Sequence, residues 1–249
     1  MKKFITYISS ISFSAIIILA CNGDGSNGAA SSEKKDIINE TPGSSQNSGV
    51  DELTIGSQVW MNKNLDADKF RNGDPIPQAK TLEQWEEFSN KKQSAWSYYE
   101  NDSINGEKYG KLYNWYAVND PRGIAPKGWH VASLKEWEIL INAQGGFKEE
   151  TAKKFIDATQ WEITDFKNSN DFNFNAKPGG GIIPVGSMGL LYFEAIGKSA
   201  YWWTSTKSNG IPAAKLIYII TNTYQGLSID FNSNDYGQGL GLSVRCVKD

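Results

Sequence analysis

Cysteine and histidine are the scarcest reactive residues in this chain, which has two cysteines and a single histidine, His130. A structural zinc site needs about four ligands, mostly Cys and His, so the chain cannot build one. Two cysteines also exclude a disulfide-rich scaffold. The sequence has neither a phosphate-binding glycine loop nor a nucleophile motif, which excludes the nucleotide-binding and hydrolase classes that those motifs define.

The N-terminus has the layout of an export signal. Lys2 and Lys3 precede an apolar run that ends at Ala20. Serines interrupt this run, and it is shorter than the about 20 apolar residues that span a membrane, so we interpret it as a removable signal peptide. Residues 18–21 (Ile-Leu-Ala-Cys) match a bacterial lipobox, in which the cysteine is acylated on sulfur and becomes the new N-terminus. Cys21 is therefore the predicted lipidation site.

The segment after the signal peptide has the composition of a flexible tether. Residues 21–50 are rich in Gly, Ser, Asn and Ala, and they have too little apolar surface to offset the entropy cost of ordering. We expect three parts: a lipoprotein signal peptide (residues 1–20), a tether (residues 21–50) and a globular domain (residues 51–249). A lipid on Cys21 predicts a lipoprotein of the bacterial outer membrane, exposed at the surface or facing the periplasm.

Charge and aromatic content characterise the expected domain. The net charge is −3 and no stretch gathers basic residues, so we expect no nucleic acid partner. The chain has 9 Trp, 11 Tyr and 11 Phe beside 24 Gly. This combination favours a loop-rich fold that aromatic side chains hold together.

Local patterns place helices before strands. Ser133 and Glu136 form a capping box that starts a helix, and Gly145 ends it. A first strand is predicted at residues 54–65. Further helices are predicted at residues 81–90, 110–118 and near 152–156, followed by loops to about residue 189. Strands are predicted at residues 201–205, 215–221, 227–231 and 242–247. Helices followed by antiparallel strands indicate the α+β class.

Six short segments carry a family resemblance. They are residues 60–65, 110–115, 126–137, 178–180, 201–206 and 243–249. In this order they resemble the Fib-succ-major paralogous domain (FISUMP), over nearly all of the expected globular part. The resemblance implies a cell-envelope lipoprotein without an assigned biochemical role. It also implies a fold related to C-type lectin-like and formylglycine-generating-enzyme-like domains.

One departure from that family concerns the second cysteine. Many members have a cysteine where this chain has Ala125, and its implied partner is the cysteine that corresponds to Cys246. Since Cys21 is assigned to lipid, we expect no intrachain disulfide. Cys246 then fits the role of a small buried hydrophobic residue in a strand.

Catalysis by Cys246 is the alternative. A nucleophilic thiol needs a base, and the implied pairing of positions 125 and 246 would bring His130 near it. No third, orienting group is apparent. We therefore expect His130 to bond a loop carbonyl instead. The resemblance does not imply formylglycine-generating activity, because those enzymes use two active-site cysteines.

Calcium is the one cofactor that the sequence leaves open. Asp230, Asn232 and Asn234 are spaced two apart, with Asp235 beside them, as oxygen ligands in a calcium loop can be. The segment lacks the Gly and Glu that an EF-hand loop needs, and lectin-type calcium motifs are absent. We favour a β-turn built from residues that tolerate left-handed backbone, and we expect no cofactor otherwise.

Trp202 and Trp203 are the candidate ligand-binding residues, because tryptophan faces stack on sugar rings. Neighbours in a strand alternate between its two faces, so at most one of the two is expected in the core. The other then faces solvent, a loop or a ligand. Coverage of both faces by long loops is the alternative, and an exposed apolar patch would decide between them.

These observations predict a membrane-anchored lipoprotein whose domain binds a ligand and is not an enzyme. The expected ligand is a glycan, a peptide or another envelope protein. A thiol- or acid-dependent enzyme on a formylglycine-generating-enzyme-like scaffold is one alternative, and a purely structural envelope protein is the other. Fold analogy does not separate them, because lectin-like scaffolds host both binding and catalysis.

Overall fold

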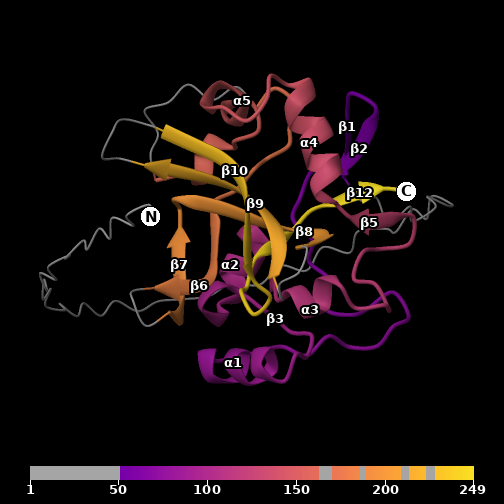
Figure 1. The fold of residues 1–249 in the computed structure, drawn as a ribbon, viewed down its shortest axis with the longest axis vertical. Helices are drawn as coiled ribbons and strands as arrows, with labels where there is room; N and C mark the ends of the chain where they lie inside the picture. Colours follow the sequence, from indigo (N-terminus) through magenta and orange to yellow (C-terminus); the bar gives the residue numbers. More distant parts are fainter. Residues whose placement is uncertain (1–50, 163–169, 186–188, 209–212, 223–227) are drawn as a thin grey trace, which may run out of the picture. The chain divides into compact units, whose positions relative to one another are not determined.

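A computed structural model describes residues 51–162, 170–185, 189–208, 213–222 and 228–249. The expected signal peptide and tether lie outside the described residues. Within them, two larger sheets and one small sheet combine with short helices (Figure 1). The α+β class predicted from the sequence is confirmed.

The first sheet joins the start of the domain to its C-terminal segment. Its four strands lie in the order β1-β2-β12-β5. They are β1 (Glu52–Ile55), β2 (Gln58–Met61), β5 (Trp129–Val131) and β12 (Cys246–Lys248). β12 pairs antiparallel with both β2 and β5. The predicted single strand at residues 54–65 is wrong, because Gly56 turns the chain at φ +61° and creates the β1–β2 hairpin.

The second sheet has six strands: five lie in the order β10-β9-β8-β6-β7, and β11 pairs with β8. They are β6 (Gly179–Val185), β7 (Leu190–Ile196), β8 (Ser199–Lys207), β9 (Ala213–Asn222), β10 (Ser228–Gly237) and β11 (Ser243–Val244). Most pairs are antiparallel, whereas β8 is parallel to β6 and to β11. A small third sheet pairs β3 (Trp96–Ser97) with β4 (Leu112–Tyr113).

β6 lies in the region, up to about residue 189, for which the sequence predicts loops, so that prediction is wrong here. The glycines of this segment favour loops in the sequence, but in β6 they allow the neighbouring strand to approach closely. Gly180 has φ +59°, and a Cβ atom there would lie 2.6 Å from the Ile196 nitrogen. A glycine-rich stretch therefore forms a strand here because no other residue fits.

The described helices are short. They are α1 (Leu82–Asn90), α2 (Ser103–Tyr109), α3 (Trp115–Val118), α4 (Leu134–Ala143) and α5 (Glu149–Lys153), with 3-10 turns η1 (Tyr99–Asn101) and η2 (Ala158–Gln160). α1 and α4 confirm the predictions, including the capping box of Ser133 and Glu136. The helix predicted at residues 110–118 is shorter, because Asn114 caps α3 and the residues before it pair as β4.

β8 separates two parts of the core. Its Trp202 side packs against α4, where Trp137 and Leu140 are buried. Its Trp203 side packs with Trp115 of α3. Figure 1 shows α4 and α5 on one side of the second sheet and α1, α2 and α3 on the other. Helices therefore cover both faces of this sheet near β8.

Candidate functional site

Trp202 and Trp203 are both fully buried, with exposed fractions of 0%. Trp202 donates its indole N–H to Asn64 Oδ1 at 2.9 Å, and Trp203 donates to the Tyr113 carbonyl at 2.8 Å. The expectation that one of the two leaves the core is wrong, because helices cover both faces of β8. Neither indole reaches a surface on which a sugar ring can stack.

The candidate calcium segment is a strand, so the turn that we favoured is wrong as well. β10 continues through these residues, paired antiparallel with β9. Asn234 and Asp235 are exposed, and successive residues of a strand point to opposite faces, so the two do not converge on one ion. The side chains of Asp230 and Asn232 lie outside the described part of the chain.

Asp235 already has protein partners. Its carboxylate accepts from the Ser208 hydroxyl and forms an ion pair with Lys215 at 2.8 Å. The hydrogen bonds from Lys215 and Ser208 hold the pKa of Asp235 below its ordinary value. Within the described ranges, no group of three or more His, Cys, Asp or Glu residues has the arrangement of a metal site.

Cys246 is buried in β12, with an exposed fraction of 0%. Burial raises the pKa of its thiol to about 12, although Arg245 and Arg71 act in the opposite direction. Cys246 is the cross-strand partner of Val131, whereas His130 is the partner of Val247. The side chains of Cys246 and His130 therefore lie on opposite faces of the first sheet, which argues against a Cys-His pair.

His130 bonds two carboxylates, and not the loop carbonyl that we expected. Its Nε2 lies 2.6 Å from Glu136 Oε1, and its Nδ1 lies 2.8 Å from Asp249 Oδ1. Burial lowers the pKa of His130, but the bonds to Glu136 and Asp249 outweigh burial and raise the pKa above its ordinary value. Glu136 also closes the capping box of α4, so His130 ties the start of that helix to the C-terminal segment.

A surface hollow lined by three tyrosines is the best candidate for a ligand site, and we call it the tyrosine hollow. It measures about 180 Å³. Tyr201 comes from β8, Tyr218 from β9 and Tyr236 from β10. The remaining lining residues are Ile183, Pro184, Leu216, Ile220, Leu240 and Leu242. The lining therefore has aromatic faces and hydroxyl groups but no charged side chain.

The sheet register brings the tyrosines together. Tyr201 and Tyr218 are directly opposite in β8 and β9, with ring centroids 6.3 Å apart. Tyr236 is 40% exposed and stands nearest to solvent. Burial raises the pKa of Tyr201, and the neighbouring Tyr236 and Glu194 add to the shift, whereas a bond from Ser199 opposes it. The Tyr201 hydroxyl thus stays protonated at neutral pH and can both donate and accept.

Exposed apolar side chains continue beside the tyrosine hollow. Tyr192 is 44% exposed and is the cross-strand partner of Ile183, a wall residue of the hollow. Val185 and Leu190 pair with each other further along the same ribbon, and both are exposed. Adjacent exposed apolar residues of this kind mark binding surfaces more often than isolated ones do.

The family comparison covers nearly all of the domain. Residues 53–248 match the family model of the Fibrobacter succinogenes major domain. The chain belongs to this family. No curated protein and no solved structure matches the chain. This membership confirms the family resemblance that the six sequence segments indicate, and it does not identify a ligand. None of the helices in the described residues has the length and apolar character needed to cross a membrane.

The sequence contained a usable signal for one of the three tyrosines. Alternation along β8 puts Tyr201 on the same face as Trp203 and opposite to Trp202. Tyr218 lies in a predicted strand, but its neighbours gave no reason to select it. Tyr236 follows a run of Asn, Asp and Ser that favours a turn, so the local pattern does not predict its place on a strand.

Proposed function

We propose that this chain is a lipid-anchored protein of the bacterial cell envelope whose domain binds a glycan and has no catalytic role. The tyrosine hollow is the observation that carries this proposal. Tyrosine rings offer an apolar face to the C–H side of a sugar and a hydroxyl to its polar edge. The absence of charged side chains from the lining favours a neutral sugar.

The size of the hollow limits the ligand. Sites for drug-sized molecules measure about 300–1,000 Å³, so 180 Å³ suits a single ring of a longer glycan. Asn234 is exposed and, by strand alternation, lies on the same face of β10 as Tyr236. Its amide would offer hydrogen bonds to sugar hydroxyls at the edge of the hollow.

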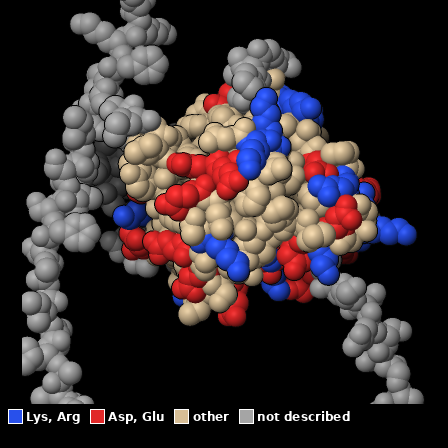
Figure 2. Space-filling model, turned by 90° about the horizontal axis from the view of Figure 1, so that it is seen from below, with Lys and Arg blue, Asp and Glu red and all other residues tan. Residues whose placement is uncertain are grey.

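The rest of the proposal concerns the location and the fold. The lipobox at Cys21 and the tether support an anchor in the outer membrane, with the domain held away from the lipid. Family membership and the loop-rich α+β architecture support a relation to C-type lectin-like domains. Figure 2 shows acidic and basic side chains interspersed over one face of the molecule, a pattern that supports the absence of a nucleic acid partner.

A glycan array with the purified full-length chain in detergent tests the proposed ligand. The wild type should bind arrayed neutral glycans with and without calcium. Tyr236→Ala should weaken that binding about fivefold, which corresponds to about 1 kcal/mol of aromatic contact, and Tyr236→Phe should retain most of it. Phe147→Ala, at a position with the same 40% exposure outside the hollow, is the matched control. Equal binding by the wild type and Tyr236→Ala would refute the site.

A second experiment tests the anchor. Mass spectrometry of the protein from bacterial membranes should find acyl chains on Cys21 at a new N-terminus. Cys21→Ala should yield neither the acyl chains nor the new N-terminus, because both depend on this cysteine. An unmodified Cys21 in membrane-bound protein would contradict the proposed anchor.

A further inference from the structure

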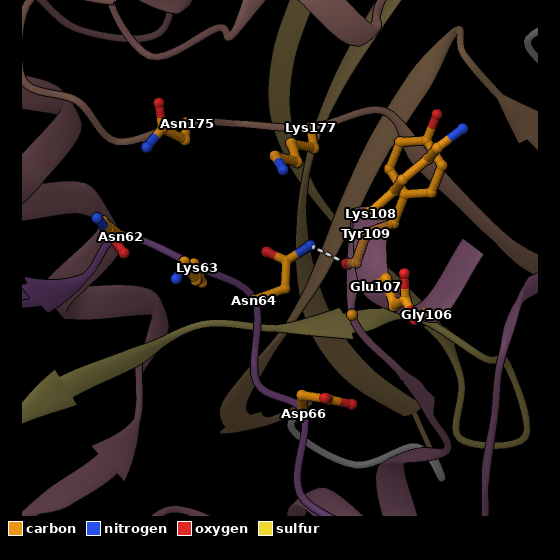
Figure 3. Close-up of a pocket in the computed structure, with 11 residues that line it drawn as sticks. Asn62, Lys63, Asn64, Asp66, Gly106, Glu107, Lys108, Tyr109, Asn175 and Lys177 are labelled. Atoms are coloured by element: carbon orange, nitrogen blue, oxygen red, sulfur yellow. Dashed lines mark hydrogen bonds between the residues drawn. The ribbon is translucent and has the colours of Figure 1, made fainter. Parts of the chain in front are cut away.

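A second hollow, which we call the polar pocket, lies away from the three tyrosines and has the opposite chemistry. It measures about 150 Å³. Three segments line it: residues 62–66 after β2, the end of α2 with residues 106–110, and residues 175–177. In the view of Figure 3, Asn64 lies between Lys63 and the α2 residues, and Asn175 and Lys177 lie above it.

Asn64 fixes the floor of the polar pocket. Its Nδ2 donates to the Tyr109 carbonyl at 2.8 Å and to Ser243 Oγ at 3.2 Å. Its Oδ1 accepts from the Trp202 indole at 2.9 Å and from Arg245 Nη2 at 3.1 Å. All the hydrogen-bonding capacity of the amide is thus used by the protein. The floor is rigid, and one of the α2 carbonyls is satisfied by an amide.

Arg245 places a positive charge directly behind this floor. The side chain is 1% exposed. Its Nη1 donates to the Met61 and Phe174 carbonyls, both at 2.9 Å, and Nη2 contacts the Asn64 and Asn175 oxygens. In the described part of the chain, Arg245 forms no ion pair with a carboxylate, and its Nε has no partner. The guanidinium also lies over the Phe174 ring, 4.3 Å from its centroid, but none of the described carboxylates neutralises its charge.

Lysines at the surface add to this charge. Lys63, Lys108 and Lys177 line the polar pocket. Lys63 pairs with Asp51 at 2.6 Å, but no ion pair among the described residues uses Lys108 or Lys177.

Two carboxylates also line the polar pocket. That of Asp66 is paired with the buried Lys111, which leaves Glu107 as the only lining carboxylate without an ion pair in the described ranges. Positive charge therefore exceeds negative charge around the polar pocket once the paired groups are set aside.

We propose that the polar pocket binds a small oxyanion group, namely a carboxylate or a phosphate carried by a larger ligand. An oxyanion there would lie near Lys177 and Lys108 and in front of the Arg245 guanidinium, which has no counter-ion among the described residues. Amide groups of Asn62 and Asn175 can add hydrogen bonds to its oxygens. A volume of 150 Å³ suits one such group and not a whole oligomer.

Thermal unfolding of the full-length chain in detergent, with added anions, tests this site. Sodium phosphate and sodium glucuronate should each be compared with sodium chloride at equal ionic strength. A ligand that binds only the folded state raises Tm in a saturable manner. We expect such a rise with at least one of the two oxyanions and none with chloride. A response to glucuronate alone indicates an acidic sugar, and a response to phosphate alone indicates a phosphorylated ligand.

Two lysine variants test whether the oxyanion response arises at the polar pocket. Lys177→Gln should weaken the oxyanion response at least fivefold, and Lys80→Gln, at an exposed lysine outside the pocket, should leave it unchanged. If Lys177→Gln lowers stability by itself, chemical-shift changes of the Asn64 and Asn175 side-chain amides on titration provide the second measurement. Equal effects of chloride and both oxyanions, or equal responses of the two variants, would overturn the proposal.

The polar pocket does not depend on the proposed glycan site. Tyr236→Ala leaves the lining of the polar pocket unchanged, so this variant should keep the full oxyanion response. Unchanged neutral-glycan binding in Tyr236→Ala, with an intact oxyanion response, would refute the tyrosine hollow alone.

Discussion

The tyrosine hollow and the polar pocket have similar sizes, about 180 and 150 Å³, but what lies behind each of them differs. Behind the tyrosine hollow, Leu216 and Leu242 belong to an apolar core that packing alone stabilises. Behind the polar pocket, Asn64 and Arg245 form a hydrogen-bonded network with a buried charge. Removal of the exposed Tyr236 ring from the tyrosine hollow should leave the fold stable. Removal of Asn64 or Arg245 from beneath the polar pocket should destabilise the fold.

The largest expected effect comes from removing the buried charge. Arg245→Met keeps much of the side-chain volume but leaves the Met61 and Phe174 carbonyls without partners. We expect the free energy of unfolding to fall by about 2–6 kcal/mol, measured by urea denaturation, because each of the two buried carbonyls left without a donor costs about 1–3 kcal/mol. Arg122→Met, which removes an exposed guanidinium, is the control and should have a far smaller effect. A change of less than about 1 kcal/mol in Arg245→Met would show that the network does not stabilise the floor.

The two buried tryptophans separate stability from site structure. Trp202→Phe and Trp203→Phe each lose an indole hydrogen bond and some packing volume, and each should lower the free energy of unfolding by about 2 kcal/mol. Of these two tryptophans, only Trp202 forms a hydrogen bond with Asn64 in the polar pocket. Trp202→Phe should therefore weaken the oxyanion response, and Trp203→Phe should not. Equal responses would mean that Asn64 keeps its position without the indole.

The thiol of Cys246 reports how far the tyrosine hollow extends inward. Cys246 belongs to the same core cluster as Leu216 and Leu242 in the hollow's lining. Its burial and its pKa of about 12 predict that a thiol reagent at pH 8 labels the native protein at least about 1,000-fold more slowly than the urea-unfolded protein. Rapid labelling of the native state would reveal an opening between the hollow and β12.

The smallest effect is the pH dependence that arises outside both hollows, at His130. Its raised pKa means that its bonds stabilise the fold below the ordinary value of 6.5, and that this stabilisation is lost as the pH rises through the folded-state pKa. Burial raises the pKa of Glu136, but bonds from Ser133 and His130 outweigh it and lower the pKa, so its contribution is lost as the pH falls through that lowered value.

His130→Gln tests this pH window. Because His130 is 40% exposed, the difference in the free energy of unfolding between the wild type and the variant should stay below about 1 kcal/mol. The difference should be largest between the lowered pKa of Glu136 and the raised pKa of His130, and it should decline at higher pH. A difference that does not vary with pH would contradict the assignment.

Local signals in the sequence predicted local structure, and tertiary contacts decided the rest. The capping box at Ser133 depends on residues three apart, and α4 begins where it predicts. The formation of β6 depends on the close approach of β7 to Gly180, and the residues near Gly180 in the sequence do not predict that approach. The burial of both Trp202 and Trp203 likewise depends on helices distant in sequence.

The candidate sites were harder to predict than the elements. Tyr201, Tyr218 and Tyr236 meet through the register of three strands, and that register is not a property of any single segment. Arg245 is a charged residue, and charged residues are almost never fully buried unless they are paired. Its place behind Asn64 follows only from the packing of segments more than 170 residues apart.

The pairing of β12 with β2 has a consequence for the order of events during synthesis. Trp60 and Val247 are adjacent in the first sheet although about 190 residues separate them in the chain. The β1–β2 hairpin emerges early from the ribosome, but one edge of β2 has no partner until β12 has emerged. Such distant contacts also close large loops and slow folding. For the exported lipoprotein that we propose, this delay would keep the domain unfolded during its passage through a translocation channel.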